Sequence, residues 1–189
     1  MLNTNASNGP RIVLIGSTSV GKTSLINRIT EKKFEPFTTP TTGTAFFQYH
    51  TKDPDHPQIQ IWDTAGMERY RSLNRIFYHE AVGAILVFDL TNYRTFEELE
   101  SWLNEFITEA PPNPSIVLVG NKCDLSDVIE VEQDEIQVFA KDHELRYFST
   151  SAFSGEGVDD MLQALLSMIP KTTTVETTNL EEPEQSKCC

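Results

Sequence analysis

The stretch that decides the fold is RIVLIGSTSVGKTSL, which runs from Arg11 to Leu25. Its first five residues form an apolar run typical of a buried strand, and a helical pattern opens at Lys22. Between them, residues 16–23 match the GxxxxGKS/T pattern, in which backbone N–H groups curl around an anion at a helix N-terminus. Lys22 is expected to reach the β- and γ-phosphates of a nucleotide, and the Thr23 hydroxyl to bind Mg²⁺. Strand, loop and helix in this order predict a phosphate-binding loop.

Short apolar runs alternate with amphipathic stretches along the rest of the chain. We expect strands at residues 11–15, 58–62, 81–88 and 115–120, and helices at 22–32, 95–109, 132–143 and 156–168. Thr95, with Glu98 three residues later, matches a capping box for the second of these helices. Strands that alternate with helices indicate βαβ units and a doubly wound, mostly parallel sheet. Residues 44–51 and 58–62 flank the turn-rich segment KDPDHP and are expected to pair as an antiparallel hairpin.

A second polar motif, NKCD at 121–124, follows the expected strand 115–120. Open α/β sheets bind ligands at the carboxyl ends of their strands, so this motif is expected near the phosphate loop. The Asp124 carboxylate can accept hydrogen bonds from N1–H and the 2-amino group of guanine, whereas adenine has no donor at either position. Asn121 is expected to contact the base or a loop, and the Lys122 stem to cover one face of the ring. The two motifs together predict a guanine nucleotide as the ligand.

Two further motifs stand at expected strand ends. Asp63 begins the segment DTAG at 63–66, and a carboxylate there is well placed to hold Mg²⁺ through a water molecule. The N–H of Gly66 is expected to meet the γ-phosphate, which would make the following segment sensitive to the nucleotide. Ser151 and Ala152 follow Tyr147 and Phe148, an apolar pair that indicates another strand end, and a backbone N–H there is expected to close over the base.

Composition restricts the classes of function. The 189 residues suffice for one domain, expected at 11–170, between a flexible arm at 1–10 and a disordered tail at 171–189 with almost no apolar content. The net charge of −13 argues against nucleic acid as a partner, because no basic patch could replace phosphate counterions. No apolar run approaches the ~18–20 residues that cross a bilayer, so any membrane attachment is expected to come from lipid. Three cysteines do not suggest a disulfide framework.

The segments GSTSVGKT, WDTAGME, NKCD and TSA occur in this order and resemble the motifs of the Ras superfamily of small GTPases, from about residue 10 to about residue 170. Within it the stronger resemblance is to Rab proteins, carried by TTGTAF at 41–46, QIWDTAGMERYRSL at 60–73, LVFDLTN at 86–92 and the terminal cysteine pair. The resemblance implies an α/β P-loop domain with a mostly parallel six-stranded sheet, one antiparallel edge hairpin and helices on both faces. It also implies a GTP hydrolase that binds GTP or GDP with Mg²⁺ and recruits effectors in membrane trafficking.

Carried over to matching positions, the resemblance implies roles for individual residues. Thr41 becomes a second hydroxyl ligand of Mg²⁺, and Phe34 packs edge-on to the guanine. Effectors would contact an apolar triad of Phe46, Trp62 and Phe77, which without the family would be interpreted as core packing. The residues expected to bind the nucleotide are Ser17, Thr18, Ser19, Val20, Gly21, Lys22, Thr23, Ser24, Phe34, Thr41, Asp63, Gly66, Asn121, Lys122, Asp124, Leu125, Ser151, Ala152 and Phe153. Those expected to act in hydrolysis are Lys22, Thr41, Gly66 and Met67, and those expected to hold Mg²⁺ are Thr23, Thr41 and Asp63.

Among the positions that depart from the family pattern, two bear directly on hydrolysis and on binding of the base. Met67 stands where most members carry the glutamine that orients the attacking water, and a thioether has no N–H to donate. Intrinsic GTP hydrolysis is therefore expected to be slow, although an activating protein that supplies both Arg and Gln could restore turnover. Phe153 replaces the lysine that usually follows Ser-Ala, which weakens the side-chain part of that motif and leaves the backbone contact in place.

The chain ends in Cys188 and Cys189. The resemblance implies geranylgeranyl groups on both, and two such chains give stable anchoring because each buried CH₂ contributes about 0.8 kcal/mol. The family further implies an exchange factor, a GTPase-activating protein and a GDP-dissociation-inhibitor-type chaperone as partners. The expected location is the cytoplasmic face of intracellular membranes, in exchange with the cytosol.

Three interpretations remain. The first is a cycling GTPase switch, and the second is a binding module of the same fold that takes up GTP and scarcely hydrolyses it. The third is a P-loop kinase or ATPase, against which the NKCD motif argues. The first two differ only in the rate of hydrolysis.

Overall fold

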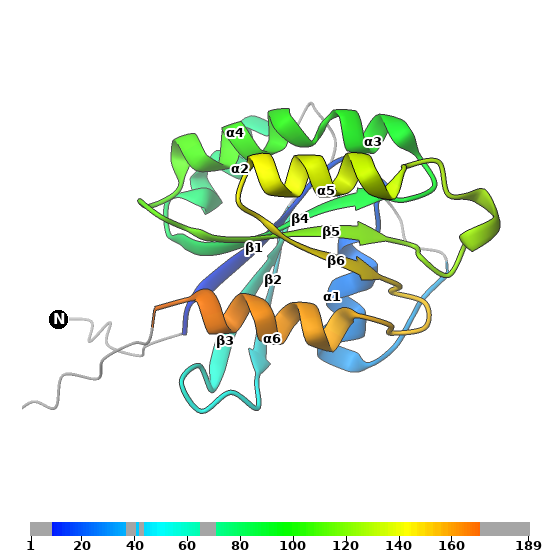
Figure 1. Ribbon diagram of the computed structural model, residues 1–189. Helices are drawn as coiled ribbons and strands as arrows, with labels where there is room; N and C mark the ends of the chain where they lie inside the picture. The colour runs from blue at the N-terminus through cyan, green and yellow to red at the C-terminus, as the bar shows by residue number, and fades with distance from the viewer. Residues whose placement is uncertain (1–8, 37–40, 42–43, 65–70, 171–189) are drawn as a thin grey trace, which may run out of the picture.

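The computed structural model describes residues 9–36, 41, 44–64 and 71–170, without the side chains of 71–74. Within these ranges, strands form one sheet in the order β2-β3-β1-β4-β5-β6 (Figure 1). They are β1 (Arg11–Ile15), β2 (Ala45–His50), β3 (Gln58–Asp63), β4 (Ala81–Asp89), β5 (Ser115–Asn121) and β6 (Arg146–Thr150). Only the edge pair β2–β3 is antiparallel, and the other neighbours run parallel. The predicted six-stranded sheet with its edge hairpin is confirmed.

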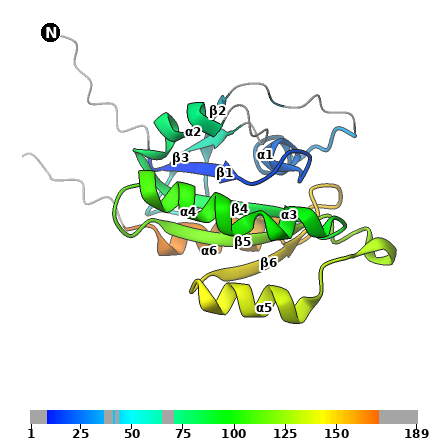
Figure 2. The same ribbon diagram turned by 90° about the horizontal axis from the view of Figure 1, so that it is seen from above.

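Helices cover both faces of the sheet. One face carries α1 (Lys22–Glu31) and α6 (Val158–Met168), and the other carries α2 (Arg71–Tyr78), α3 (Tyr93–Glu97), α4 (Leu99–Glu109) and α5 (Gln133–Asp142). A short 3₁₀-helix, η2 (Ser126–Val128), lies in the loop after β5. The view from above shows the strands crossing the molecule in sheet order between these layers (Figure 2). No helix among the described residues is both long and apolar enough to cross a bilayer.

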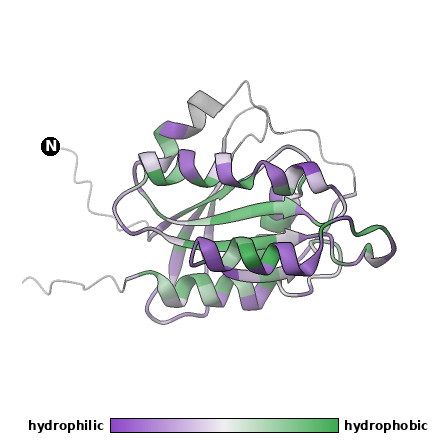
Figure 3. Ribbon diagram, turned by 45° about the horizontal axis from the view of Figure 1, so that its top comes forward, coloured by the Kyte–Doolittle hydropathy of each residue, from purple (hydrophilic) through white to green (hydrophobic). Residues whose placement is uncertain are grey.

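The central strands are buried on both faces, which explains their continuous apolar sequences. In β1, Ile12 and Leu14 belong to the core under α1 and α6, whereas Val13 and Ile15 belong to the core under α2–α5. All four side chains are fully buried. The hydropathy colouring shows the same division, with hydrophobic central strands between helices that mix hydrophobic and hydrophilic residues (Figure 3).

The helix expected at 95–109 differs from the prediction. It is two helices, α3 and α4, that meet at Glu98, and the residue before the first helix is Asn92. Thr95 lies inside α3, where its hydroxyl accepts a hydrogen bond from the Asp89 N–H at 3.0 Å and donates to the Asn92 carbonyl at 2.7 Å. The Glu98 carboxylate contacts Ser17 instead of returning to the Thr95 N–H. The predicted capping box is therefore wrong, because Thr95 lies within α3 and the Glu98 carboxylate makes a tertiary contact with Ser17.

Candidate functional site

The loops that follow β1, β5 and β6 meet α1 around a cavity of about 540 Å³. Its walls are formed by Thr18, Ser19, Gly21, Lys22, Thr23, Ser24, Phe34, Glu35, Pro36, Thr41, Asn121, Lys122, Asp124, Leu125, Ala152 and Phe153. Four other residues of the predicted nucleotide-binding set do not line the cavity, but each is hydrogen-bonded to a residue that does. They are Ser17, Val20, Asp63 and Ser151. Gly66 and Met67 lie outside the described residues, as do Cys188 and Cys189. Motifs far apart in sequence thus converge on one cavity.

At one end of the cavity the backbone forms a cradle suited to an anion. Gly16, Ser19 and Gly21 all have positive φ, at 137°, 62° and 97°, and turns of this kind gather N–H groups into a concave nest. The ammonium of Lys22 donates to the carbonyls of Gly16 and Ser17, both at 2.8 Å. Burial lowers the pKa of Lys22 to about 8, and the Asp63 charge opposes the shift. An ammonium has three donors, so one remains for an anion in the cradle.

Gly16 leaves no room for a side chain. A Cβ at this position would lie 2.1 Å from the backbone oxygen of Val87 in β4, and the φ of +137° is strained for any other residue. We expect Gly16→Ala to lower the free energy of unfolding by about 3 kcal/mol, measured by urea denaturation. The matched control is Gly155→Ala, at φ +91°, where the nearest atom would be at an ordinary 3.5 Å. If both variants lose the same free energy of unfolding, the loss comes from backbone strain at positive φ and not from the clash with β4.

Three oxygen-bearing side chains gather beside Lys22. The Thr23 hydroxyl donates to Asp63 Oδ2 at 2.6 Å, and the Thr41 hydroxyl lies 3.1 Å from Thr23 Oγ1 and 3.2 Å from Asp63 Oδ2. Burial raises the pKa of Asp63, which the Thr23 hydrogen bond and the Lys22 charge oppose. The second carboxylate oxygen, Asp63 Oδ1, is buried and has no partner among the described residues. This cluster combines one carboxylate with two hydroxyls, the oxygen ligands that a hard cation prefers.

Asn121, the last residue of β5, joins the phosphate loop to the end of β6. Its amide Nδ2 donates to the Val20 carbonyl at 2.9 Å, and its Oδ1 accepts from the Ala152 N–H at 3.2 Å and the Thr150 hydroxyl at 3.3 Å. The side chain is 1% exposed. Of the two roles expected for Asn121, contact with a loop is therefore the one that the structure supports, since its polar atoms are already engaged by protein.

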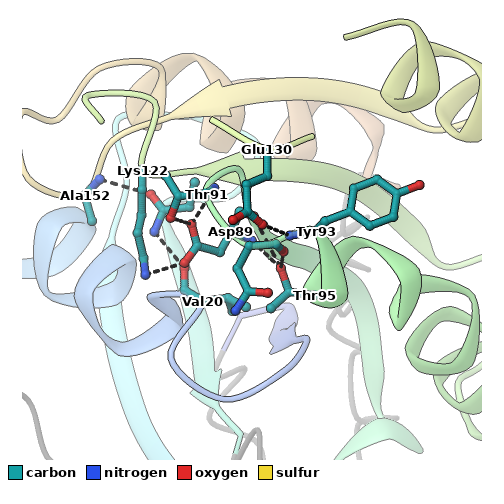
Figure 4. A network of polar contacts seen from close by, with 10 residues as sticks. Val20, Asp89, Thr91, Tyr93, Thr95, Lys122, Glu130 and Ala152 are labelled. Carbon is teal, nitrogen blue, oxygen red and sulfur yellow. Dashed lines mark hydrogen bonds and ion pairs between the residues drawn. The ribbon is translucent and has the colours of Figure 1, made fainter. Parts of the chain in front are cut away.

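Asp124 and Lys122 are both fixed by polar neighbours. Asp124 is exposed, and its Oδ1 accepts a hydrogen bond from the Ser151 hydroxyl at 2.5 Å. The Lys122 ammonium lies 2.5 Å from Asp89 Oδ2, and Asp89 Oδ1 accepts from the N–H and hydroxyl of Thr91 at 2.9 and 2.8 Å (Figure 4). Lys122 also lines the cavity, and the expectation that its stem covers one face of the guanine ring stays a prediction.

Sequence reasoning missed some residues that shape the site. Asp89 ends β4 just as Asp63 ends β3, and this position was the signal that could have identified it. Glu98 contacts the Ser17 hydroxyl, which also accepts from Trp102 Nε1 at 3.1 Å. These contacts join residues 81 and 85 positions apart, so no local pattern could have revealed them.

The predicted apolar triad forms a continuous aromatic surface away from the cavity. Ring centroids of Phe46 and Trp62 are 5.1 Å apart, and those of Trp62 and Phe77 are 5.0 Å apart. Arg11 lies over the Trp62 ring at 4.7 Å from its centroid. Phe46 is 45% exposed, so this surface is open to contact and is not simply part of the core.

Comparison with known proteins identifies the family. A model of the Ras family matches residues 11–171. The chain is 41% identical over 161 residues to "Probable Ras-related protein Rab-4A" of Echinococcus multilocularis, covering 84% of this chain and 72% of that protein. It is 38% identical to Ras-related protein RABA1a of Arabidopsis thaliana (85% and 75% covered) and 37% identical to Ras-related protein Rab-27B of Bos taurus (85% and 79% covered). The chain therefore belongs to the Ras family of small GTPases and is of the Rab type.

Proposed function

We propose that this chain is a Rab-type switch that binds GTP or GDP with Mg²⁺ and recruits effectors at intracellular membranes. The observation that carries the proposal is one cavity lined by two chemically different groups of residues. Lys22 and the nest of positive-φ residues suit phosphates, and the Asp124 carboxylate suits the two N–H donors of guanine. Phe34 and Lys122 line the same cavity as Asp124, and a flat base would lie against them.

Mg²⁺ fits the phosphate end of the cavity. In nucleotide sites this ion is held by one or two carboxylates or hydroxyls together with the phosphates. Thr23, Thr41 and Asp63 would hold it, and the unpartnered buried Oδ1 of Asp63 supports that assignment. When bound, the ion would neutralise charge that develops on the transferred phosphoryl group. Lys22 would place a second positive charge against the β- and γ-phosphates.

We further propose that the chain alone hydrolyses GTP slowly. Met67 has neither a donor nor a strong acceptor with which to orient a water molecule. Gly66 would contribute its N–H to the γ-phosphate, and Thr41 would close on the same group. The chain would then depend on an activating protein for its return to the GDP state.

The test is single-turnover hydrolysis of GTP that has been loaded onto the chain with Mg²⁺. We expect Met67→Gln to hydrolyse GTP at least about tenfold faster than the wild type, because the amide can orient the attacking water. A Met67→Leu variant is the matched control and should keep the wild-type rate, since it changes shape without adding a donor. Equal rates for wild type and Met67→Gln would contradict the role assigned to Met67.

The same measurement separates the cycling switch from the module that is locked with GTP. Addition of a Rab-type activating domain should speed hydrolysis in the wild type if the missing glutamine is supplied in trans. Unhydrolysed GTP under both conditions would favour the locked module. Failure of the wild type to retain any guanine nucleotide would refute the proposal as a whole.

Membrane attachment and partners complete the proposed function. Prenyl groups on Cys188 and Cys189 would anchor the chain through residues 171–189, and a GDP-dissociation-inhibitor-type chaperone would cover them. The aromatic surface of Phe46, Trp62 and Phe77 is partly exposed, which supports its use by effectors. An exchange factor and an activating protein would act on the nucleotide state.

A further inference from the structure

Two aromatic side chains stand together at the base end of the cavity. Phe34 follows α1 and Phe153 follows β6, and both line the cavity near Asp124. Their ring centroids are 5.3 Å apart with an interplanar angle of 88°, an edge-to-face geometry that is favourable for aromatic pairs. Phe153 is nevertheless 60% exposed. A ring so open to solvent contributes little to the core, so its place beside Phe34 needs another explanation.

One arginine ties together the two loops that carry these rings. Arg28 in α1 donates from Nε to the Ala152 carbonyl at 2.9 Å and from Nη2 to the Phe153 carbonyl at 2.5 Å. Its remaining nitrogen, Nη1, donates to the Lys32 carbonyl at 2.9 Å. Every nitrogen of the guanidinium is thus used, and two of these bonds reach residues 124 and 125 positions away. A planar, rigid fork of this kind fixes the relative position of its acceptors.

The bond to Lys32 ties Arg28 to the backbone two residues before Phe34. Lys32 ends α1 in the left-handed conformation at φ 56°, so its carbonyl marks the point at which the chain leaves the helix toward Phe34. The Lys32 ammonium also lies 2.7 Å from the Asp159 carboxylate in α6. On the other side, a Cβ on Gly155 would reach 3.5 Å from Arg28 Cδ, so the loop 151–155 packs closely on the arginine stem.

We propose that Arg28 is a positioning residue that holds Phe34 and Phe153 together as an aromatic clamp on the guanine base, and that this clamp sets the rate of nucleotide release. The inference rests on the proposed function, because it assumes guanine beside Asp124. Stacking and edge contacts hold the base without reading its identity, so the clamp adds residence time while Asp124 provides base selection. Release of the nucleotide requires the loops 32–36 and 151–155 to separate, and the three Arg28 hydrogen bonds resist that separation.

The experiment follows release of fluorescent GDP from the full chain into excess unlabelled GTP, with Mg²⁺ and again with EDTA. We expect Arg28→Met to speed release about tenfold, since it removes the hydrogen bonds that tie the two loops together and keeps an apolar side chain of similar length. Arg28→Lys should release GDP nearly as fast as Arg28→Met, because one ammonium cannot reach all three carbonyls. Phe153→Ala should also speed release, and the double variant Arg28→Met/Phe153→Ala should be hardly faster than either single variant. Arg146→Met, at an exposed arginine that begins β6, is the matched control and should release GDP at the wild-type rate.

The outcomes separate this inference from the function on which it rests. If the wild type retains GDP and Arg28→Met releases it at the wild-type rate, the clamp is wrong. An acceleration that disappears in EDTA would place the effect at the metal end of the cavity and would likewise overturn the inference. Because Phe153 is exposed, Phe153→Ala tests the clamp even if Arg28→Met folds poorly. A wild type that retains no guanine nucleotide would instead refute the proposed function.

Discussion

Replacement of Lys22 by methionine is expected to weaken the binding of GDP and GTP by about 10³-fold, measured by titration of a fluorescent nucleotide. The ammonium is buried and donates to Gly16 and Ser17 at 2.8 Å. Methionine has a similar length and no charge, so the variant loses both the hydrogen bonds that shape the loop and the charge-assisted bond to phosphate. The one ammonium donor left for phosphate contributes about 1.5–3 kcal/mol as a charge-assisted bond. The loss of the two bonds that shape the loop adds about 1–2 kcal/mol, and together these losses give an effect of this size.

Lys22→Met should not unfold the protein without nucleotide. Burial of the ammonium is costly, as its lowered pKa of about 8 indicates, so removal of the charge offsets part of the lost hydrogen bonding. At a fixed GDP concentration, the stabilisation that GDP gives against thermal unfolding should fall by about 4 kcal/mol, the equivalent of a 10³-fold loss of affinity. Lys141→Met, at an exposed lysine in α5, should change neither measurement. An affinity within about threefold of the wild type would contradict the role assigned to Lys22.

The fold was predictable where the sequence pattern has a local cause. β1, β4 and β5 lie in the middle of the sheet and are buried on both faces, so each is a continuous apolar run that stands out in the sequence. The phosphate loop was predictable for a similar reason, because its glycines stand where the local backbone adopts positive φ. Gly16 and Gly21 have φ values of 137° and 97°, which other residues rarely adopt.

Parts of the site that depend on tertiary contacts were not predictable. Thr95 and Glu98 have the spacing of a capping box, yet the Glu98 carboxylate contacts Ser17, 81 positions away. A cap and a tertiary bridge need the same side chains, and sequence spacing does not distinguish them. Arg28 is a similar case, since an arginine on an amphipathic helix looks solvated until the carbonyls of Ala152 and Phe153 are brought to it.

Asp124→Asn is expected to exchange base specificity, lowering the affinity for GDP by ~10²–10⁴-fold and raising that for xanthosine diphosphate. A carboxylate offers two acceptors to the N1–H and 2-amino donors of guanine. An asparagine offers one acceptor and one N–H donor, so its amide would meet the guanine amino group donor against donor. Xanthine has an oxygen at that position, which accepts from the amide while its N1–H still donates to the carbonyl.

The hydrogen bond from Ser151 should hold the asparagine of the variant in the position that Asp124 occupies. The hydrogen bond from the Ser151 hydroxyl to Oδ1, at 2.5 Å, can be kept by the amide oxygen of asparagine, so the side chain should stay in place. Competition between GDP and xanthosine diphosphate on the same loaded protein measures the change directly. Asp127→Asn, in the exposed turn η2, is the matched control and should leave base preference unchanged. If Asp124→Asn weakened both nucleotides equally, Asp124 would act through loop structure or charge and not by pairing with the base.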